Sequence, residues 1–178
     1  MTNPTRRRFL LLSSGFAATA LSGCASAPYV MTVGRAEPVS HVSPTDAQAA
    51  LNRMRHDEGL PEVRHNATLQ KVADEQAAIM ARTAKLAHTA ADGEAFITRL
   101  RRQNFWGGAG ENLAGGPPTL QSVIDGWMTS PAHHKVMVNP DYRQFGLAIR
   151  RGQATASNTY GTYWALVMGV TPPAWAQV

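Results

Sequence analysis

The segment HNATLQKVADEQAAIMARTAKLAH, residues 65–88, has the pattern of an amphipathic helix. Its apolar residues fall at helical spacing: Leu69, Val72, Ala73, Ala77 and Met80. We therefore expect a helix from about Asn66 to Leu86. Such a helix would place His88 just past its end, so the function of the chain depends on which other side chains reach this histidine.

Two more helices are predicted around this one. Ser43, Pro44 and Asp46 form a cap signature for a helix that ends near Gly59. Its apolar face carries Ala47, Ala50, Leu51 and Met54. A further helix is expected from Asp92 to about Arg102. It places Ala95, Phe96, Arg99 and Leu100 near one side, and Arg101 and Arg102 on a solvated face.

A fourth helix is predicted beyond the glycine-rich segment, with Trp127 as a core residue. Its apolar residues follow the i, i+3, i+4, i+7 pattern: Leu120, Val123, Ile124 and Trp127. At Ser130 and Pro131 a short helix restarts, with Ser130 able to cap it. His133 and His134 would project from its start at about 100° to each other. Only one of these two histidines can therefore face a given cleft.

The C-terminal part of the domain reads as a hairpin. Residues 145–150 and 160–170 are strand-like and are joined by the polar stretch GQATASNT. The predicted fold class is therefore α+β, with helices packed on a small, mainly antiparallel sheet.

The stretch GGAGENLAGG, residues 107–116, surrounds one carboxylate with very small residues. A helix would not tolerate so many glycines, so we expect the backbone to fold tightly around Glu111. The carboxylate could satisfy backbone donors of its own loop, or it could reach a histidine.

Four motifs in order resemble the bacterial branch of the CAP superfamily, also called the SCP or cysteine-rich secretory protein domain. They are residues 65–88, GENLAGG, WMTSPAHHKVMVNPDYRQFGLAI and YWALVMG. The resemblance covers about residues 44–170. It implies a three-layer α-β-α sandwich with a cleft lined by His and Glu side chains, which in some members binds a divalent metal.

Carried over residue by residue, the resemblance assigns the cleft to His88, Glu111 and His133, with Asn112 and Ser130 in support. The larger family has a second glutamate in a Trp-x-x-Glu arrangement, and here that position is Ser130. Two imidazoles and a carboxylate are the ligands of many open zinc sites, so these residues are compatible with zinc or another divalent metal as cofactor. Without metal, the same three groups could hydrogen-bond to each other or to a small ligand.

Simpler interpretations stay open for each residue. His88 could interact with a helix dipole, and His134, His41, His56 and His65 are expected at the surface. Ser130 beside His133 would suit a serine hydrolase, but a helix cap is the simpler role for this serine. An ionised Glu111 near either ring would favour the protonated imidazole.

The first residues read as an export signal, with a basic cluster in TRRRFL, residues 5–10, before an apolar run. TRRRFL resembles the twin-arginine motif, and LSGC, residues 21–24, resembles a lipobox in which Cys24 is acylated, for example with palmitate. The apolar run falls short of the roughly 20 residues of a membrane span, which disfavours an uncleaved anchor. Ala25 in place of aspartate favours an outer membrane, at its periplasmic face.

Cleavage before Cys24 would leave 155 residues, enough for one domain. The predicted parts are a signal peptide (1–23), a lipidated tether (24–43), the CAP domain (44–171) and a tail (172–178). At most about 3.5 Å per residue, the tether would keep the domain within ~60 Å of the membrane. Cys24 is the only cysteine, so no disulfide or catalytic thiol is expected.

The charge of the chain disfavours a nucleic-acid partner. Because the leader holds three arginines and no acid, its removal lowers the formal net charge from +5 to +2. Three function classes stay open: a binding module for an envelope lipid or glycan, a metal-assisted hydrolase or protease, and a scaffold with a vestigial site. The missing second glutamate disfavours metal hydrolysis, because Glu111 would have to be both ligand and base.

Overall fold

A computed structural model describes residues 39–90, 93–153 and 160–171. The predicted leader, the lipobox and the C-terminal tail lie outside these ranges, as does most of the tether. No helix in the described ranges is both long enough and apolar enough to span a bilayer. The elements, in chain order, are α1 (Pro44–Asp57), β1 (Arg64–His65), α2 (Ala67–Thr83), α3 (Phe96–Arg102), β2 (Ala109–Gly115), α4 (Leu120–Thr129), α5 (Pro131–Met137), β3 (Gln144–Arg151) and β4 (Thr162–Gly169).

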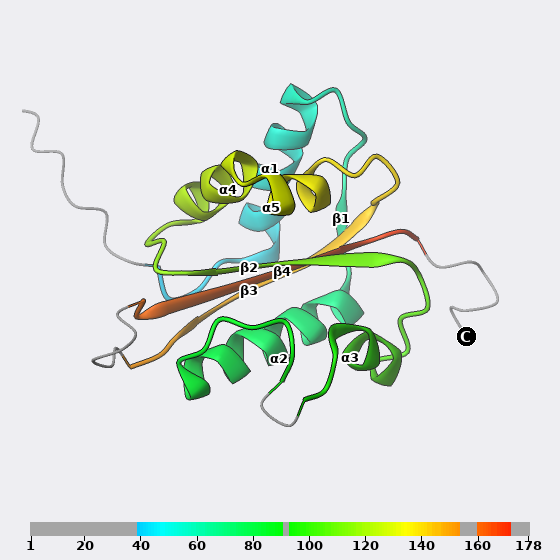
Figure 1. Ribbon diagram of the computed structural model, residues 1–178. Coiled ribbons are helices and arrows are strands. Elements are labelled where there is room, and N and C mark those ends of the chain that lie inside the picture. The colour runs from blue at the N-terminus through cyan, green and yellow to red at the C-terminus, as the bar shows by residue number, and fades with distance from the viewer. Residues whose placement is uncertain (1–38, 91–92, 154–159, 172–178) are drawn as a thin grey trace, which may run out of the picture. The chain divides into compact units, whose positions relative to one another are not determined.

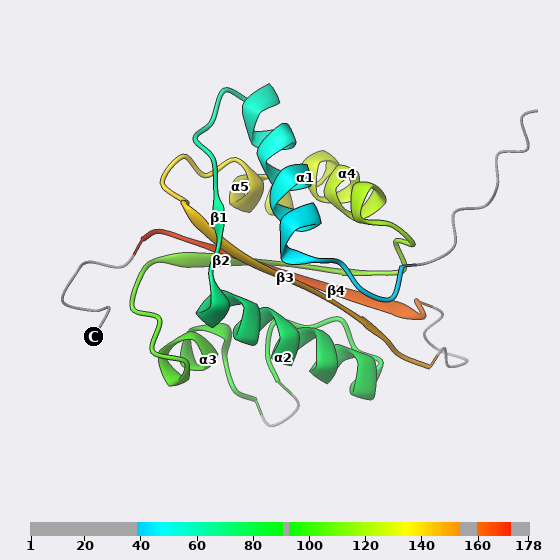
Figure 2. The same cartoon turned by 180° about the vertical axis from the view of Figure 1, so that it is seen from behind.

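The described strands form one sheet with the order β1-β3-β4-β2. The two-residue β1 pairs with β3 in parallel, and the β3–β4 and β4–β2 pairs are antiparallel. Helices α1, α4 and α5 lie on one face of the sheet, and α2 and α3 lie on the other (Figures 1 and 2). The predicted α-β-α sandwich is therefore confirmed, and β2 is an edge strand.

The apolar faces predicted for the first two helices are buried. Ser43 accepts from the backbone N–H of Asp46 and begins α1 as expected. In α2 all the residues of the predicted apolar face are buried against the sheet. This helix ends at Thr83, earlier than predicted, because Ala84 adopts a left-handed conformation with φ of 53°. That conformation cannot continue a right-handed helix.

The third helix begins later than predicted. It starts at Phe96, and residues 93–95 before it are not helical. Arg102 is exposed, in agreement with the predicted solvated face, while Arg101 is half-buried. Arg99 and Leu100 are both buried. The apolar side of α3 therefore carries a buried cation, which needs a partner in the interior.

The prediction of a tight loop around Glu111 was wrong, because the segment is the extended strand β2. Its glycines permit close approach by other side chains. A Cβ on Gly110 would lie 2.9 Å from the Tyr142 hydroxyl and 3.0 Å from Val136, and one on Gly115 would overlap the Tyr160 ring. These glycines let neighbouring side chains pack directly on an edge strand.

Two cores fill the spaces on either side of the sheet. Trp127 is buried, as predicted, and its Nε1 donates to the carbonyl of Leu113 on β2. Strands β3 and β4 form the predicted hairpin, and all of β4 is buried. Alternate residues of β4 face opposite layers, so Trp164 packs with α1 and α4 while Tyr163 packs with α2.

Arg55 is a buried residue of α1 that the sequence did not single out. Its guanidinium donates to four backbone carbonyls, those of Pro61, Met137, Asn139 and Tyr142. Burial, and then the charge of Arg143, lower the pKa of Arg55. The residue ties the end of α5 and the following turn to α1, which fixes the layer that carries His133.

Candidate functional site

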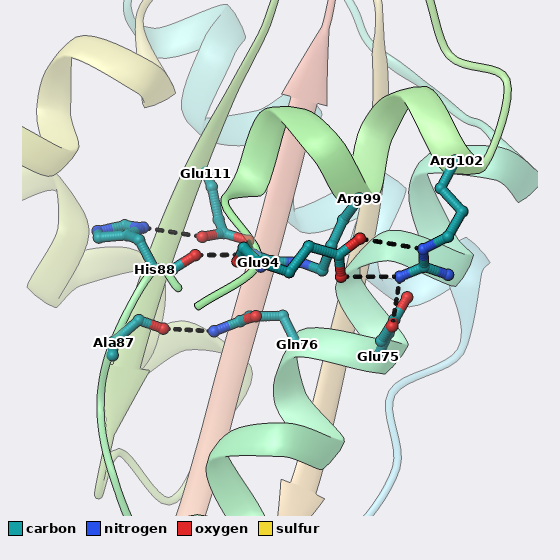
Figure 3. A network of polar contacts seen from close by, with 8 residues as sticks. All are labelled: Glu75, Gln76, Ala87, His88, Glu94, Arg99, Arg102 and Glu111. Atoms are coloured by element: carbon teal, nitrogen blue, oxygen red, sulfur yellow. Dashed lines mark hydrogen bonds and ion pairs between the residues drawn. The ribbon is translucent and has the colours of Figure 1, made fainter. Parts of the chain in front are cut away.

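The site begins with Glu111, a buried carboxylate on the edge strand. Its Oε2 lies 2.8 Å from Nδ1 of His88 (Figure 3). The Glu111 side chain is 1% exposed, whereas that of His88 is 60% exposed. A buried acceptor therefore orients an imidazole that is largely in contact with solvent.

The other carboxylate oxygen of Glu111 forms an ion pair with Arg99. Nη2 of Arg99 lies 3.2 Å from Oε1 of Glu111, and the arginine side chain is 0% exposed. Nη1 also donates to the carbonyl of Glu94, and Nη2 donates to the carbonyl of His88. Both donor–acceptor distances are 3.0 Å. Arg99 thus connects α3, the segment between α2 and α3, and β2 (Figure 3).

The segment that carries His88 is held from two sides. Arg99 binds the carbonyl of His88, and the Gln76 side chain of α2 donates to the carbonyl of Ala87. At the surface, Arg102 pairs with Glu94 and with Glu75 of α2. These contacts fix the position of His88 although it lies outside regular secondary structure.

His133 belongs to α5, on the other face of the sheet. Nδ2 of Asn112 on β2 donates to the carbonyl of His133, at a distance of 2.9 Å. Consecutive residues of a strand point to opposite faces, so Glu111 binds the His88 segment while Asn112 binds α5. The two histidine-bearing segments are therefore both attached to the edge strand, at adjacent residues.

The pKa values of the two imidazoles are shifted in opposite directions. The hydrogen bond to Glu111 raises the pKa of His88, against smaller opposing effects of burial and of Arg99. Burial lowers the pKa of His133, and the charge on His88 lowers it further. His88 therefore protonates before His133 as pH falls.

A family model, that of the cysteine-rich secretory protein family, matches residues 48–168. The chain belongs to the CAP family. Among curated proteins, none matches the sequence. The match covers most of the described domain and includes each residue of the candidate site.

Solved structures show the same fold at low sequence identity. An outer surface protein from Borrelia burgdorferi is 21% identical with a TM-score of 0.61, over 75% of this chain and 100% of that one. An extracellular SCP-domain protein from Bacillus anthracis is 17% identical with a TM-score of 0.60, over 75% and 45%. A cysteine-rich secretory protein from Staphylococcus aureus is 19% identical with a TM-score of 0.53, over 72% and 38%. This chain spans less than half of the last two proteins.

The contacts within this CAP domain do not favour the predicted three-ligand metal centre. Both oxygens of Glu111 already contact protein groups, namely His88 and Arg99. Within residues 39–90, 93–153 and 160–171, no three His, Cys, Asp or Glu side chains are grouped as a metal site requires. A zinc ion bound by Glu111 would have to replace one of its existing contacts, so the metal site stays a prediction.

Ser130 occupies the cap position of α5 but does not cap it with its side chain. Its Oγ lies 2.9 Å from Nδ1 of His133 instead. The prediction that the Ser130 side chain caps α5 is therefore wrong, because its hydroxyl contacts the imidazole of His133 instead of the backbone of the helix. The position of the missing family glutamate thus holds a group that orients the second histidine of the CAP domain.

The prediction that the other histidines lie at the surface is only partly correct. His41 and His56 are exposed as expected, but His134 and His65 are half-buried, and His65 packs edge-on against Phe145. His88 lies in the segment after α2 and contacts Glu111, so a helix dipole does not explain it.

Arg99 is the site residue that the sequence analysis missed. Helical spacing places Arg99 on the apolar side of the third helix, with Phe96 and Leu100. A charged residue at such a position needs a buried partner of opposite charge. That signal pointed to an acidic partner, and Glu111 is the acidic residue of the glycine-rich segment.

Proposed function

We propose that this CAP-domain protein is an exported binding protein of the cell envelope, in which His88 and His133 together contact a small hydroxyl-bearing ligand. The ligand class includes glycans and lipid head groups. The observation that carries the proposal is the contrast in burial between Glu111 and His88. A carboxylate withdrawn from solvent holds an exposed ring in one orientation, as a preorganised binding site requires.

The opposite pKa shifts of the two rings suit a hydroxyl group. At a pH between the lowered pKa of His133 and the raised pKa of His88, His133 is a neutral imidazole and His88 is an imidazolium. Their segments are attached to adjacent residues of β2, Asn112 and Glu111. An imidazolium only donates hydrogen bonds, whereas a neutral imidazole both donates and accepts. A hydroxyl can accept from the first ring and donate to the second, which a simple anion or a simple cation cannot do.

Export and lipid anchoring are the second part of the proposal. The twin-arginine-like run and the lipobox ending at Cys24 support them. The Borrelia protein is described as an outer surface protein and the Bacillus protein as extracellular, which agrees with export. Anchoring through Cys24 at the periplasmic face of an outer membrane is the corresponding location.

A metal-binding site is the alternative that one observation favours. Each ring uses Nδ1 within the protein, for Glu111 or for Ser130. Glu111 would then be an outer partner that orients His88, an arrangement common around protein-bound zinc. Two imidazoles would supply the protein ligands. Hydrolysis by such a centre and a scaffold without ligand are weaker candidates, since no further observation supports them. The Ser130–His133 contact suits a serine hydrolase, but in the described residues no acidic side chain bonds the His133 ring as a third catalytic group would.

The test follows the ring resonances of His88 and His133 by NMR while ligands are added. One arm uses a soluble peptidoglycan disaccharide, and the other uses a short-chain phospholipid below its micelle concentration. We expect one arm to shift both rings, and His88→Gln to abolish the shift at His133. The matched control His41→Gln, in an exposed residue, should leave the shift intact. Unperturbed rings in both arms would refute the hydroxyl-ligand proposal.

A further inference from the structure

An exposed tryptophan lies beside α3, on the same side of the sheet as α2. Trp106 is 51% exposed, while its neighbours Phe105 and Gly107 are buried. A Cβ on Gly107 would lie 2.9 Å from the Val170 carbonyl, so the backbone here is packed against β4's end. The ring is therefore presented outward by a fixed backbone.

Two residues of α3 extend this surface. Arg101 places its guanidinium 5.1 Å from the centroid of the Trp106 ring. Ile97 precedes Arg101 by one helical turn, so the two residues share a face of α3, and Ile97 is also 51% exposed. Ile97, Arg101 and Trp106 thus form an apolar surface with one cation, which we call the α3 surface.

Among the described residues, the structure shows no ion pair between Arg101 and the nearby acids Glu75 and Glu94. Glu75 and Glu94 both pair with Arg102. The hydrogen bond of the Arg101 side chain goes to the carbonyl of Phe105, which is neutral. A tryptophan, an aliphatic residue and a cation are the residue types that proteins place at the boundary between lipid head groups and acyl chains.

We propose that the α3 surface docks the domain onto an anionic lipid bilayer, with Trp106 inserted among the head groups. This inference rests on the proposed anchoring through Cys24. Because Val39 already donates to the carbonyl of Pro118, the free tether is residues 24–38, which would hold the domain within ~53 Å of the bilayer. A short tether gives the domain an effective concentration in the millimolar range at the bilayer. A small surface with low intrinsic affinity for lipid is therefore sufficient for docking. Docking would fix which side of the domain faces the membrane.

The experiment uses the full acylated chain in vesicles and follows contact between Trp106 and lipid. Phospholipids brominated in their acyl chains quench the fluorescence of a tryptophan that touches them. Trp127 and Trp164 are buried, and Trp175→Phe removes the one tryptophan outside the described residues. In this background we expect quenching in vesicles that contain phosphatidylglycerol, and its complete loss in Trp106→Phe.

Two arginine variants test the role of charge. Arg101→Gln should reduce the quenching in anionic vesicles, because basic residues near an anionic surface are attracted to it. Arg53→Gln is the matched control, since Arg53 is exposed on α1 at the other face of the sheet. It should leave the quenching unchanged.

The outcomes separate docking from anchoring. Protein that floats with the vesicles but shows equal emission with brominated and ordinary lipid overturns docking alone. Quenching that persists in Trp106→Phe also overturns it, because another tryptophan would then touch the lipid. Wild-type protein that fails to float with the vesicles overturns the anchoring, and with it the docking that depends on the tether.

Discussion

Arg99 and Glu111 form a buried ion pair between α3 and β2, with 3.2 Å between Nη2 and Oε1 and neither side chain more than 1% exposed. The pair supports the exposed His88, which contacts the other oxygen of the same carboxylate. Removal of one member would leave the other charged and unpaired in the interior, which is much more costly than removal of both.

We therefore expect Arg99→Met to lower the free energy of unfolding by about 3–5 kcal/mol. Glu111→Gln should also destabilise the domain, and the double variant should lose less than the sum of the two. Urea denaturation of the three variants measures this coupling. Arg102→Met is the control, because Arg102 makes its ion pairs at the surface. Additive losses would show that the two residues act independently.

The His88–Glu111 contact should make stability depend on pH. The pKa of His88 is raised in the folded protein, mainly by the hydrogen bond to Glu111. Its contribution is therefore present in full below the unfolded value of about 6.5, and it is lost as pH rises through the raised pKa. Wild type should exceed His88→Gln in stability by more at pH 5.5 than at pH 9.

The size of this difference should stay within about 1 kcal/mol, because an exposed ring is screened by solvent. Denaturation midpoints of wild type and His88→Gln across this pH range provide the measurement. His41→Gln controls for the loss of one exposed histidine. A difference between wild type and His88→Gln that grows toward pH 9 would have the wrong sign for this contact.

His88 should influence the titration of His133. The pKa of His133 is lowered by burial and, in second place, by the charge on His88. His88→Gln removes that charge, so the pKa of His133 should rise toward its ordinary value but not reach it. An NMR titration of the His133 ring in both proteins checks this. An identical titration in the two proteins would mean that the rings do not interact.

Zinc titration separates the hydroxyl-ligand proposal from the metal alternative. We expect no tight binding to wild type at pH 7.5. Both oxygens of Glu111 contact Arg99 and His88, which leaves only two imidazoles as ligands, fewer than the three protein ligands of open zinc sites. Calorimetry at pH 7.5 and 5.5 tests this, with His133→Gln and its neighbour His134→Gln as a matched pair. Tight binding that weakens at pH 5.5 and is lost only in His133→Gln would establish the metal site, since protons compete with zinc for imidazole.

The buried and exposed tryptophans should differ in their effect on stability. Trp127→Ala should cost about 3–5 kcal/mol, the range for removal of a large buried aromatic side chain. Trp106→Ala should change the free energy of unfolding little, because Trp106 is 51% exposed. Urea denaturation compares the two. Equal losses would place Trp106 in the core and remove the basis for lipid docking.

The sequence by itself determined the elements that depend on local patterns. Helical spacing identified the apolar faces of α1, α2 and α4, and Trp127 lies in the core as that spacing required. Two strand-like segments joined by the polar stretch GQATASNT identified the β3–β4 hairpin. These features are encoded in residues close together in the chain, so periodicity suffices to find them. The family resemblance then assigned the candidate site to His88, Glu111 and His133.

Only the tertiary structure decided how those residues are arranged. Glycines around Glu111 suit a tight loop or a closely packed strand, and pairing with β4 makes the segment a strand. Arg99 and Glu111 come from different elements, and no spacing rule connects their side chains. Ser130 could cap α5 or orient His133, and the position of the ring selects the second role. Each of these outcomes depends on contacts between segments whose distance in space is set by the packing of layers, which local sequence patterns do not specify.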